Sequence, residues 1–520
     1  MQEKSLHSTS LYSSQSLSSS ADELTETFVP DPRFERGLEG RRRKAAATLM
    51  GVWTGTVTLH LLPVGSWIVF GLTAVVGIHL LVIFFKRPNA SGEAIDSERA
   101  IDSDADLPFM SLLVAAKNEE AVIESLVHDL CNLSYPSDRY ELWIVDDASS
   151  DQTPQILDQL TLKYPHLNVF HRPENAGGGK SGALNDVLPK TQGDILGVFD
   201  ADAQVGQDVL KSIVPLFQHP KVGAIQLRKA TMNWQENFWT YNQASEMLFD
   251  SFMQARRIAN GGIGELRGNG QFVRRSALQQ CDGWNEQTIT DDLDLTLRLH
   301  LNDWDIHFLS DPAVGEEGVT SGLALWHQRS RWAEGGYQRY LDYWRLIIRN
   351  KLGYRKSFDL LTFLFLQYIV PTAALPDALM AIARHRLPIL SPLTGLVVCF
   401  SFLFMSIGIG EAQFAELRAK KLKAKKVQAK KVQTKKVQAK TLQAQKSQAQ
   451  RRSLPDADMS TPSLSILEIV GTSLRTLGSS VMGTLYMVHW IPVVAATTFR
   501  ISVRPKRLKW VKTAHRGTST

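Results

Sequence analysis

Cysteine is scarce in this sequence: Cys131, Cys281 and Cys399 are the only three in 520 residues, and they lie far apart. They form no Cys-x-x-Cys pair, and no histidines cluster at metal-ligand spacing. This pattern argues against both a disulfide framework and a zinc site. It is typical of a protein that faces a reducing compartment such as the cytosol.

A complete phosphate-binding P-loop is also missing. The glycine-rich run that follows Asn175 ends in Gly-Lys-Ser, but Glu174 stands where the P-loop pattern requires its first glycine. The match to the P-loop pattern therefore fails. A glycine-rich turn with a lysine at a helix start can still hold a diphosphate through charge and backbone donors, so Lys180 remains a candidate ligand.

Long hydrophobic runs, by contrast, are abundant: they cover residues 45–62, 67–85, 360–383, 390–410 and 481–499. A helix needs roughly 20 mostly apolar residues to cross a bilayer. We interpret the first two runs as a transmembrane hairpin, with a buried core hairpin as the alternative, because soluble helices are rarely apolar on every face. Basic residues flank both outer ends of this pair. The positive-inside rule therefore predicts a multi-pass membrane protein whose N-terminus and following domain face the cytoplasm.

The formal charge of +6 is unevenly spread, with basic clusters at residues 41–44, 420–452 and 500–516. The middle cluster repeats a five-residue unit, Ala-Lys-Lys-Val-Gln, whose valines fall on no single helical stripe. We interpret it as a solvated loop that lies on anionic lipid, and we expect no nucleic acid partner.

The number of membrane spans stays open. Five spans would place the C-terminal tail outside, whereas its charge favours the inside. Either residues 464–477 make a sixth pass or one segment lies in the interface.

Between residues 108 and 350 the composition is that of a soluble α/β domain. Short β-rich runs alternate with helical periodicity: we expect strands at 109–114, 142–145, 168–170, 195–199 and 224–227, and helices at 120–130, 153–164, 184–190 and 209–217. This alternation predicts a mostly parallel sheet with helices on both faces. Ligands in such folds bind beyond the carboxyl ends of the strands.

Two carboxylates, Asp200 and Asp202, directly follow the strand expected over residues 195–199. Residues i and i+2 of a strand point to the same side, so we expect the two side chains to converge. Hard cations such as Mg²⁺ are usually held by one or two carboxylates plus substrate phosphates. The alternative is a strand-end turn with solvated acids, but the accompanying motifs favour a metal site.

Acids also follow the first two expected strands. Glu119 comes after the first strand, and Asp146 and Asp147 end the second. Ser149 or Asp151 can cap the next helix, but capping leaves Asp146 and Asp147 unexplained. We therefore expect a polar binding edge along these strand ends.

Two further motifs lie downstream. Asp291 and Asp292 open a helix, where acids also suit the helix dipole. Gln328, Arg331 and Trp332 share one helical face through their i, i+3, i+4 spacing. An Arg–Trp pair in this setting serves either packing or recognition of an anionic leaving group.

Taken in order, these motifs resemble those of the family 2 glycosyltransferases. A closer resemblance over residues 108–376, through the runs 261–271, 283–290 and 333–344, is to one subgroup, the cyanobacterial monoglucosyldiacylglycerol synthases. The resemblance implies a GT-A-like α/β domain inserted between transmembrane helices. The one departure from the family pattern is Asp291, where the usual residue is glutamate.

The resemblance also implies roles for individual residues. They are Asp292 as general base; Glu119, one of Asp146 and Asp147, Lys180 and Asp200 in donor binding; Gln328, Arg331 and Trp332 at the acceptor and diphosphate; and Asp200 and Asp202 as ligands of Mg²⁺. The implied reaction is an inverting transfer of glucose from UDP-glucose to diacylglycerol, which gives a galactolipid precursor. The alternatives are a processive polysaccharide synthase, which would make a ladder of products, and a non-catalytic transporter or scaffold.

The expected organisation follows the same order along the chain. It comprises a disordered Ser-rich tail (1–40), a transmembrane hairpin (41–87), a cytosolic glycosyltransferase domain (108–335), an interfacial helix region (336–358), transmembrane helices (359–411), a Lys-rich low-complexity loop (418–452), C-terminal membrane segments (463–499) and a basic tail (500–520).

Overall fold

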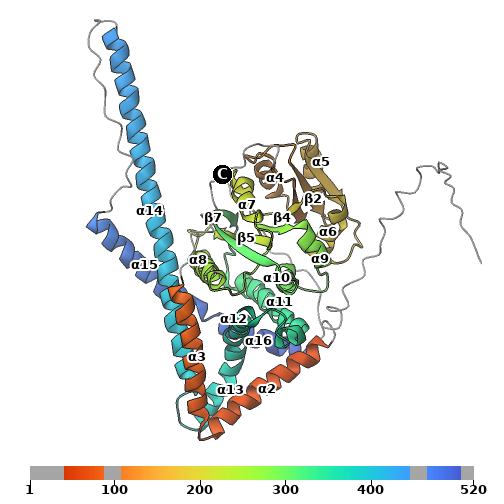
Figure 1. Cartoon of the computed structure of the whole chain (residues 1–520), viewed down its shortest axis with the longest axis vertical. Coiled ribbons are helices and arrows are strands. Elements are labelled where there is room, and N and C mark those ends of the chain that lie inside the picture. The colour runs from red at the N-terminus through yellow and green to blue at the C-terminus, as the bar shows by residue number, and fades with distance from the viewer. Residues whose placement is uncertain (1–39, 87–106, 445–464, 505–520) are drawn as a thin grey trace, which may run out of the picture.

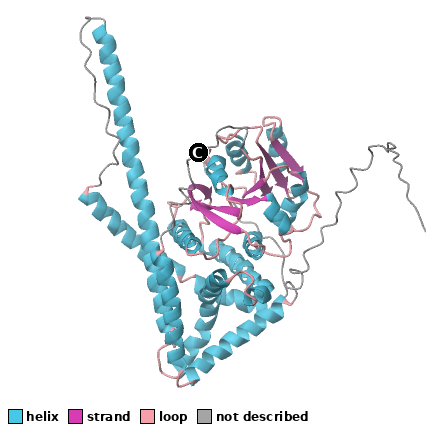
Figure 2. Ribbon diagram, viewed as in Figure 1, coloured by secondary structure: helices cyan, strands magenta, loops and turns pink. Residues whose placement is uncertain are grey.

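The computed structural model describes residues 40–86, 107–444 and 465–504. Its strands gather in one lobe, here called the sheet lobe, and the long helices form a second lobe beside it, here called the membrane lobe (Figure 2). The expected disordered tail, apart from Gly40, and residues 505–520 of the expected basic tail lie outside the described residues.

Seven strands form one sheet in the order β3-β2-β1-β4-β6-β5-β7. Their bounds are β1 Met110–Ala116, β2 Tyr140–Asp146, β3 Leu167–His171, β4 Ile195–Phe199, β5 Val222–Thr231, β6 Gln271–Arg274 and β7 Asp305–Glu316. Neighbouring strands are parallel except β6, which is antiparallel to both β4 and β5. This arrangement confirms the predicted GT-A-like class. Strands β6 and β7 were not predicted.

Alternating apolar side chains explain why helices cover both faces of the sheet. In β1, Leu112 and Val114 pack in the core under α4, α5 and α7, whereas Leu113 and Ala115 pack under α6, α9 and α10. The helix bounds are α4 Ile123–Cys131, α5 Thr153–Thr161, α6 Gly179–Val187, α7 Val209–Phe217, α9 Arg275–Gln280 and α10 Asp291–Leu301. The carboxyl ends of β1, β2 and β4 therefore open at one edge.

Four helical stretches in the described residues are long and apolar enough to cross a membrane. They are Gly65–Phe85 (α3); Tyr354–Ala383, made of α12 Tyr354–Leu364, the π-helical turn η4 Phe365–Ile369 and α13 Val370–Ala383; Ser391–Leu422, in α14; and Ile466–Val503, made of α15 Ile466–Met487 and α16 Trp490–Val503. Helices α3 and α14 lie side by side (Figure 1) and share an apolar core with α8 (Phe238–Ala259).

Helix α2 (Arg41–Leu61), the first half of the expected hairpin, is not among these four stretches. Threonines, glycines and His60 interrupt its apolar sequence, which lowers its hydropathy below that of α3. Instead, α2 packs against α13 and α16. Only the second helix of the expected hairpin therefore has the composition of a membrane span.

The Lys-rich repeat is helical as far as the structure describes it. We expected a loop over residues 418–452, but α14 runs without a break from Ser391 to Ala444, and residues 445–452 lie outside the described part. The physical reason is local: alanine, lysine and glutamine are good helix formers, and the repeat has no glycine or proline to stop the helix.

The expected interfacial region, residues 336–358, is only partly exposed. Within α11 (Gly322–Ile348), Tyr340 and Tyr343 are buried in a core with α16, whereas Trp344 and Ile348 are exposed. The mixture of aromatic and basic residues thus serves two purposes. The two tyrosines pack in the protein core, and Trp344 remains at the surface.

Asp377 has structural partners inside the membrane lobe. Its carboxylate contacts Nε2 of His60 at 2.7 Å and accepts from the backbone N–H groups of Ile389 and Leu390 at 2.8 and 3.2 Å. A carboxylate in a membrane helix is costly unless it is paired. Asp377 therefore ties α13 to α2 and to the residues just before α14.

Candidate active site

Lys180 and Asp200 form an ion pair at the end of β4. The carboxylate of Asp200 accepts from Nζ of Lys180 at 2.5 Å. Lys180 lies in the first turn of α6, which begins after Gly178 at φ +77, a left-handed conformation that glycine adopts easily. Burial disfavours the charged form of Lys180, but Asp200 and Asp291 outweigh burial and raise its pKa. This lysine is therefore a permanent cation beside the strand end.

Asp202 and Glu316 bring two more carboxylates to the same place. Asp202 accepts from the backbone N–H of Glu317 at 3.0 Å, and Glu316, at the end of β7, pairs with Lys229 at 2.6 Å. Burial raises the pKa of Glu316, and the charges of Asp202 and Asp200 raise it further, although Lys229 opposes them. The carboxylates of β4 and β7 therefore repel one another.

A divalent cation would relieve this repulsion. Among the described residues, no group of three or more His, Cys, Asp or Glu side chains is arranged to hold a metal by itself. The oxygen donors of Asp200 and Asp202 fit a hard cation that completes its shell with water and phosphate oxygens. These residues thus suit a metal that binds together with a diphosphate.

Asp292 has the environment of a general base. It lies in the first turn of α10, and the backbone N–H of Leu293 donates to its Oδ1 at 2.8 Å. Burial, followed by the neighbouring charge of Asp291, raises the pKa of Asp292 to about 6, although Lys180 partly opposes the shift. A carboxylate with a pKa near the working pH accepts a proton more readily than an ordinary aspartate.

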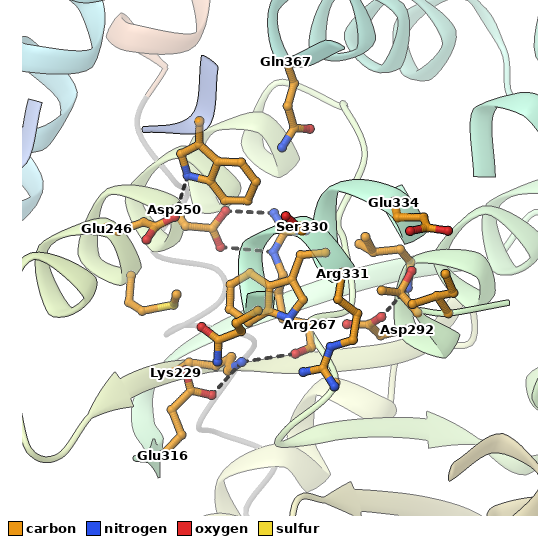
Figure 3. A pocket seen from close by; sticks show the side chains of 18 of the residues that line it. Lys229, Glu246, Asp250, Arg267, Asp292, Glu316, Ser330, Arg331, Glu334 and Gln367 are labelled. Carbon is orange, nitrogen blue, oxygen red and sulfur yellow. Dashed lines mark hydrogen bonds and ion pairs between the residues drawn. The ribbon is translucent and has the colours of Figure 1, made fainter. Parts of the chain in front are cut away.

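Helix α11 carries Gln328, Arg331 and Trp332 to the facing wall. The side chain of Arg331 points into the cavity near Asp292 (Figure 3). Its positive charge acts on both Asp200 and Asp292. This placement allows Arg331 to offset negative charge that develops on a leaving group between these carboxylates.

The ring of Trp332 lies beside two cations. Nζ of Lys229 lies 5.4 Å from the ring centroid, and the guanidinium carbon of Arg329 lies 4.0 Å from it. Arg329 is buried and pairs with Glu246 of α8 at 2.6 Å. Cation–π contacts of this kind fix the orientation of the indole.

One cavity of about 1340 Å³ joins these side chains. Its wall includes the predicted residues Glu119, Lys180, Asp200, Asp202, Asp292, Gln328, Arg331 and Trp332. Asp146 and Asp147 do not line it. Asp146 contacts Nδ1 of His171 at 2.9 Å, and Asp147 pairs with Arg172, so both lie in a charged cluster at the end of β2.

The cavity also contains charged residues that sequence reasoning missed, chiefly Lys229, Glu246, Arg267 and Glu316. The adjacent acids at 316 and 317, shortly before the helix with the Arg-Trp motif, were an available signal. Nothing local marks the other three, because their place depends on how β5, α8 and the loop before β6 pack.

The mostly parallel sheet and the carboxylates at its edge define the class as a nucleotide-sugar transferase of GT-A type. A family model described as "Glycosyltransferase like family 2" matches residues 108–335. A protein named beta-monoglucosyldiacylglycerol synthase from Nostoc sp. (strain PCC 7120) is 52% identical over 481 residues, which cover 92% of this chain and 90% of that protein. Its namesake from Synechocystis sp. (strain PCC 6803) is 48% identical over 482 residues, with 93% and 90% covered. The chain belongs to glycosyltransferase family 2.

Solved structures show a more distant likeness. A mannosyltransferase from Pyrobaculum calidifontis, in complex with GDP-Man and Mn²⁺, is 21% identical, with a TM-score of 0.48. The match covers 66% of this chain and 90% of that protein.

The raised pKa of Asp292 predicts the pH dependence of activity. Activity should fall as the pH decreases through about 6, because protonation of Asp292 removes the base. Asp291→Asn removes a neighbouring negative charge and should move this acid limb to lower pH by roughly half a unit. The measurement is kcat/KM across the acidic and neutral range. A limb that stays in place in the variant would contradict the assignment.

Close packing around Gly335 predicts that a larger residue there displaces the start of α10. A Cβ at Gly335 would lie 2.2 Å from Oγ1 of Thr290, the residue before Asp291 and Asp292. Gly335→Ala should therefore displace the start of α10 and lower kcat by about tenfold to a hundredfold, while UDP binding changes little. Gly395→Ala, in α14, is the control, because nothing lies within 4 Å of its Cβ position. Equal kcat values in the two variants would refute the packing argument.

Proposed function

We propose that the chain transfers glucose from UDP-glucose to the free hydroxyl of 1,2-diacylglycerol and forms β-monoglucosyldiacylglycerol. The observation that carries this proposal is the cavity itself, whose wall combines the carboxylates of the sheet edge with apolar residues of the membrane helices. A diphosphate donor needs the charged edge of the sheet, a lipid acceptor needs an apolar wall, and this cavity brings the two together. The names of the relatives at 48% and 52% identity support the same reaction.

The donor diphosphate would lie at the end of β4. Lys180 supplies a positive charge, and Asp200 and Asp202 would hold Mg²⁺, which, when bound, offsets the charge of the phosphate oxygens. Glu119 lines the same cavity, and this supports its assignment to nucleoside binding. Asp146 and Asp147 do not contact the donor in this proposal. They stabilise the end of β2 through their ion pairs with His171 and Arg172.

Transfer itself requires one displacement. Asp292 takes the proton of the acceptor hydroxyl while that oxygen forms a bond to the anomeric carbon of glucose. The bond from that carbon to the UDP oxygen breaks on the opposite side, so the α-linked donor gives a β-linked product. Arg331 offsets the negative charge that UDP gains.

We further propose that the sheet lobe faces the cytoplasm. The basic residues Arg42, Arg43 and Lys44 lie in the first turn of α2, and Lys86 follows α3. Arg41 at the start of α2 donates to the backbone carbonyl of Gln287, and the carbonyl of Lys86 accepts from Arg256 of α8, so both basic ends adjoin the sheet lobe. UDP-sugars reach the site from that side. Trp344, exposed on α11, is placed to contact the interface.

The reaction can be tested in membranes that contain the expressed chain, supplied with diacylglycerol and either labelled UDP-glucose or labelled UDP-galactose. We expect one lipid product with a single glucose, made from UDP-glucose. Asp292→Asn should lower turnover by about 10²- to 10⁴-fold while UDP-glucose still binds, because only the proton acceptor is lost. A ladder of product lengths would favour a processive synthase, and a galactosyl lipid would overturn the donor assignment.

A further inference from the structure

The cavity extends well beyond the charged sheet edge. Its volume of about 1340 Å³ exceeds the range of roughly 300–1,000 Å³ that is common for small-molecule sites. The additional wall comes from α3, α8, η4, α14 and α16, and includes Leu80, Met253, Leu366, Phe400, Phe404 and Ile491. This part, which we call the apolar extension, is built largely from helices with the composition of membrane spans.

Polar groups mark the junction between the two parts of the cavity. Gln367 of the π-helical turn η4 points into the cavity from one wall, and Ser330 of α11 lies on another (Figure 3). The Oγ atom of Ser330 is buried and has no hydrogen-bond partner within the part of the chain that the structure describes. Single π-turns inside long helices are frequent at functional sites. The junction therefore offers a donor and acceptor set for a small polar group.

The apolar extension also opens sideways. Val398 of α14 and Ile491 of α16 line the cavity, yet they are 52% and 41% exposed. Residues that line a cavity and are exposed at the same time lie at its mouth. This mouth lies among helices that span the apolar part of a bilayer, where a lipid could enter without crossing water.

We propose that the apolar extension binds the acyl chains of the acceptor lipid, with the glycerol group at Gln367 and Ser330 and its free hydroxyl toward Asp292. This inference rests on the proposed function and adds the residues that select the acceptor. A growing polysaccharide is a poor occupant, because the cavity face of α14 presents Val397, Val398, Phe400, Ser401 and Phe404, with no charged group among them. Acyl chains match such a surface.

A substitution that fills the apolar extension tests the proposal. Ser401 lies on the cavity face of α14, so Ser401→Trp should exclude part of an acyl chain. We expect kcat/KM for a long-chain diacylglycerol to fall about tenfold, the effect of excluding about two methylene groups from apolar surroundings. The kcat/KM for a dibutyryl glycerol and the affinity for UDP should stay within about twofold.

A matched control lies on the same helix. Leu403 is exposed and does not line the cavity, so Leu403→Trp adds the same side chain to α14 without filling the apolar extension. It should leave both acceptors unaffected. Equal losses in the two variants would overturn the proposal, because they would show a general disturbance of α14.

Loss of UDP binding would show that Ser401→Trp fails to fold. A second pair of variants then provides the same test. Leu366 of η4 also lines the cavity, whereas Leu361, one to two turns earlier, is exposed and outside the lining. Leu366→Trp should show the same selective loss with the long-chain lipid, and Leu361→Trp should not. If the unmodified protein makes the glucolipid but these variants use long chains normally, the acyl site is wrong and the proposed function stands. If the unmodified protein makes no glucolipid, the proposed function itself fails.

Discussion

Repulsion between enclosed carboxylates is the constraint on which the site depends. Strands β4 and β7 and helix α10 each deliver acids to one cavity. Burial, together with the charges of Asp202 and Asp200, raises the pKa of Glu316, and burial, together with the charge of Asp291, raises that of Asp292. Lys180 and Lys229 offset only part of this charge. The Lys229–Glu316 pair is the more enclosed of the two, with side chains 11% and 16% exposed, so removal of Lys229 would leave an uncompensated carboxylate in the cavity wall. The remaining negative charge suits a divalent cation and its diphosphate, and burial beside Asp291 raises the pKa of Asp292, the proposed base.

One buried carboxylate near this cavity joins the sheet lobe to the membrane lobe. Glu246 of α8 accepts from Arg329 at 2.6 Å, from Nε1 of Trp490 at 2.9 Å and from the hydroxyl of Tyr486 at 3.2 Å. Helix α11, which carries the Arg-Trp motif, is thereby fixed to α15 and α16 through one carboxylate. A single connected wall can therefore position a soluble donor and a lipid acceptor against each other.

Local pattern was enough to predict the strand end with Asp200 and Asp202, because β4 is an uninterrupted apolar run and two acids at i, i+2 spacing follow it. It failed for β7, where polar residues and Pro312 hide a strand that is held by its pairing with β5. It also placed Tyr340 and Tyr343 at a membrane surface, since composition does not reveal which side of α11 packs against α16. The roles of Lys229 and Glu246 depend on contacts between distant segments, so no window of sequence contains them.

The most direct measurement is the affinity for UDP as a function of Mg²⁺ concentration, determined by calorimetry. In the unmodified protein, Mg²⁺ should raise the affinity for UDP, because the cation joins the diphosphate to the carboxylates of β4. In Asp202→Asn, most of that gain should disappear, a loss of about tenfold or more. An equal gain in both proteins would contradict the claim that these carboxylates form a metal–diphosphate site.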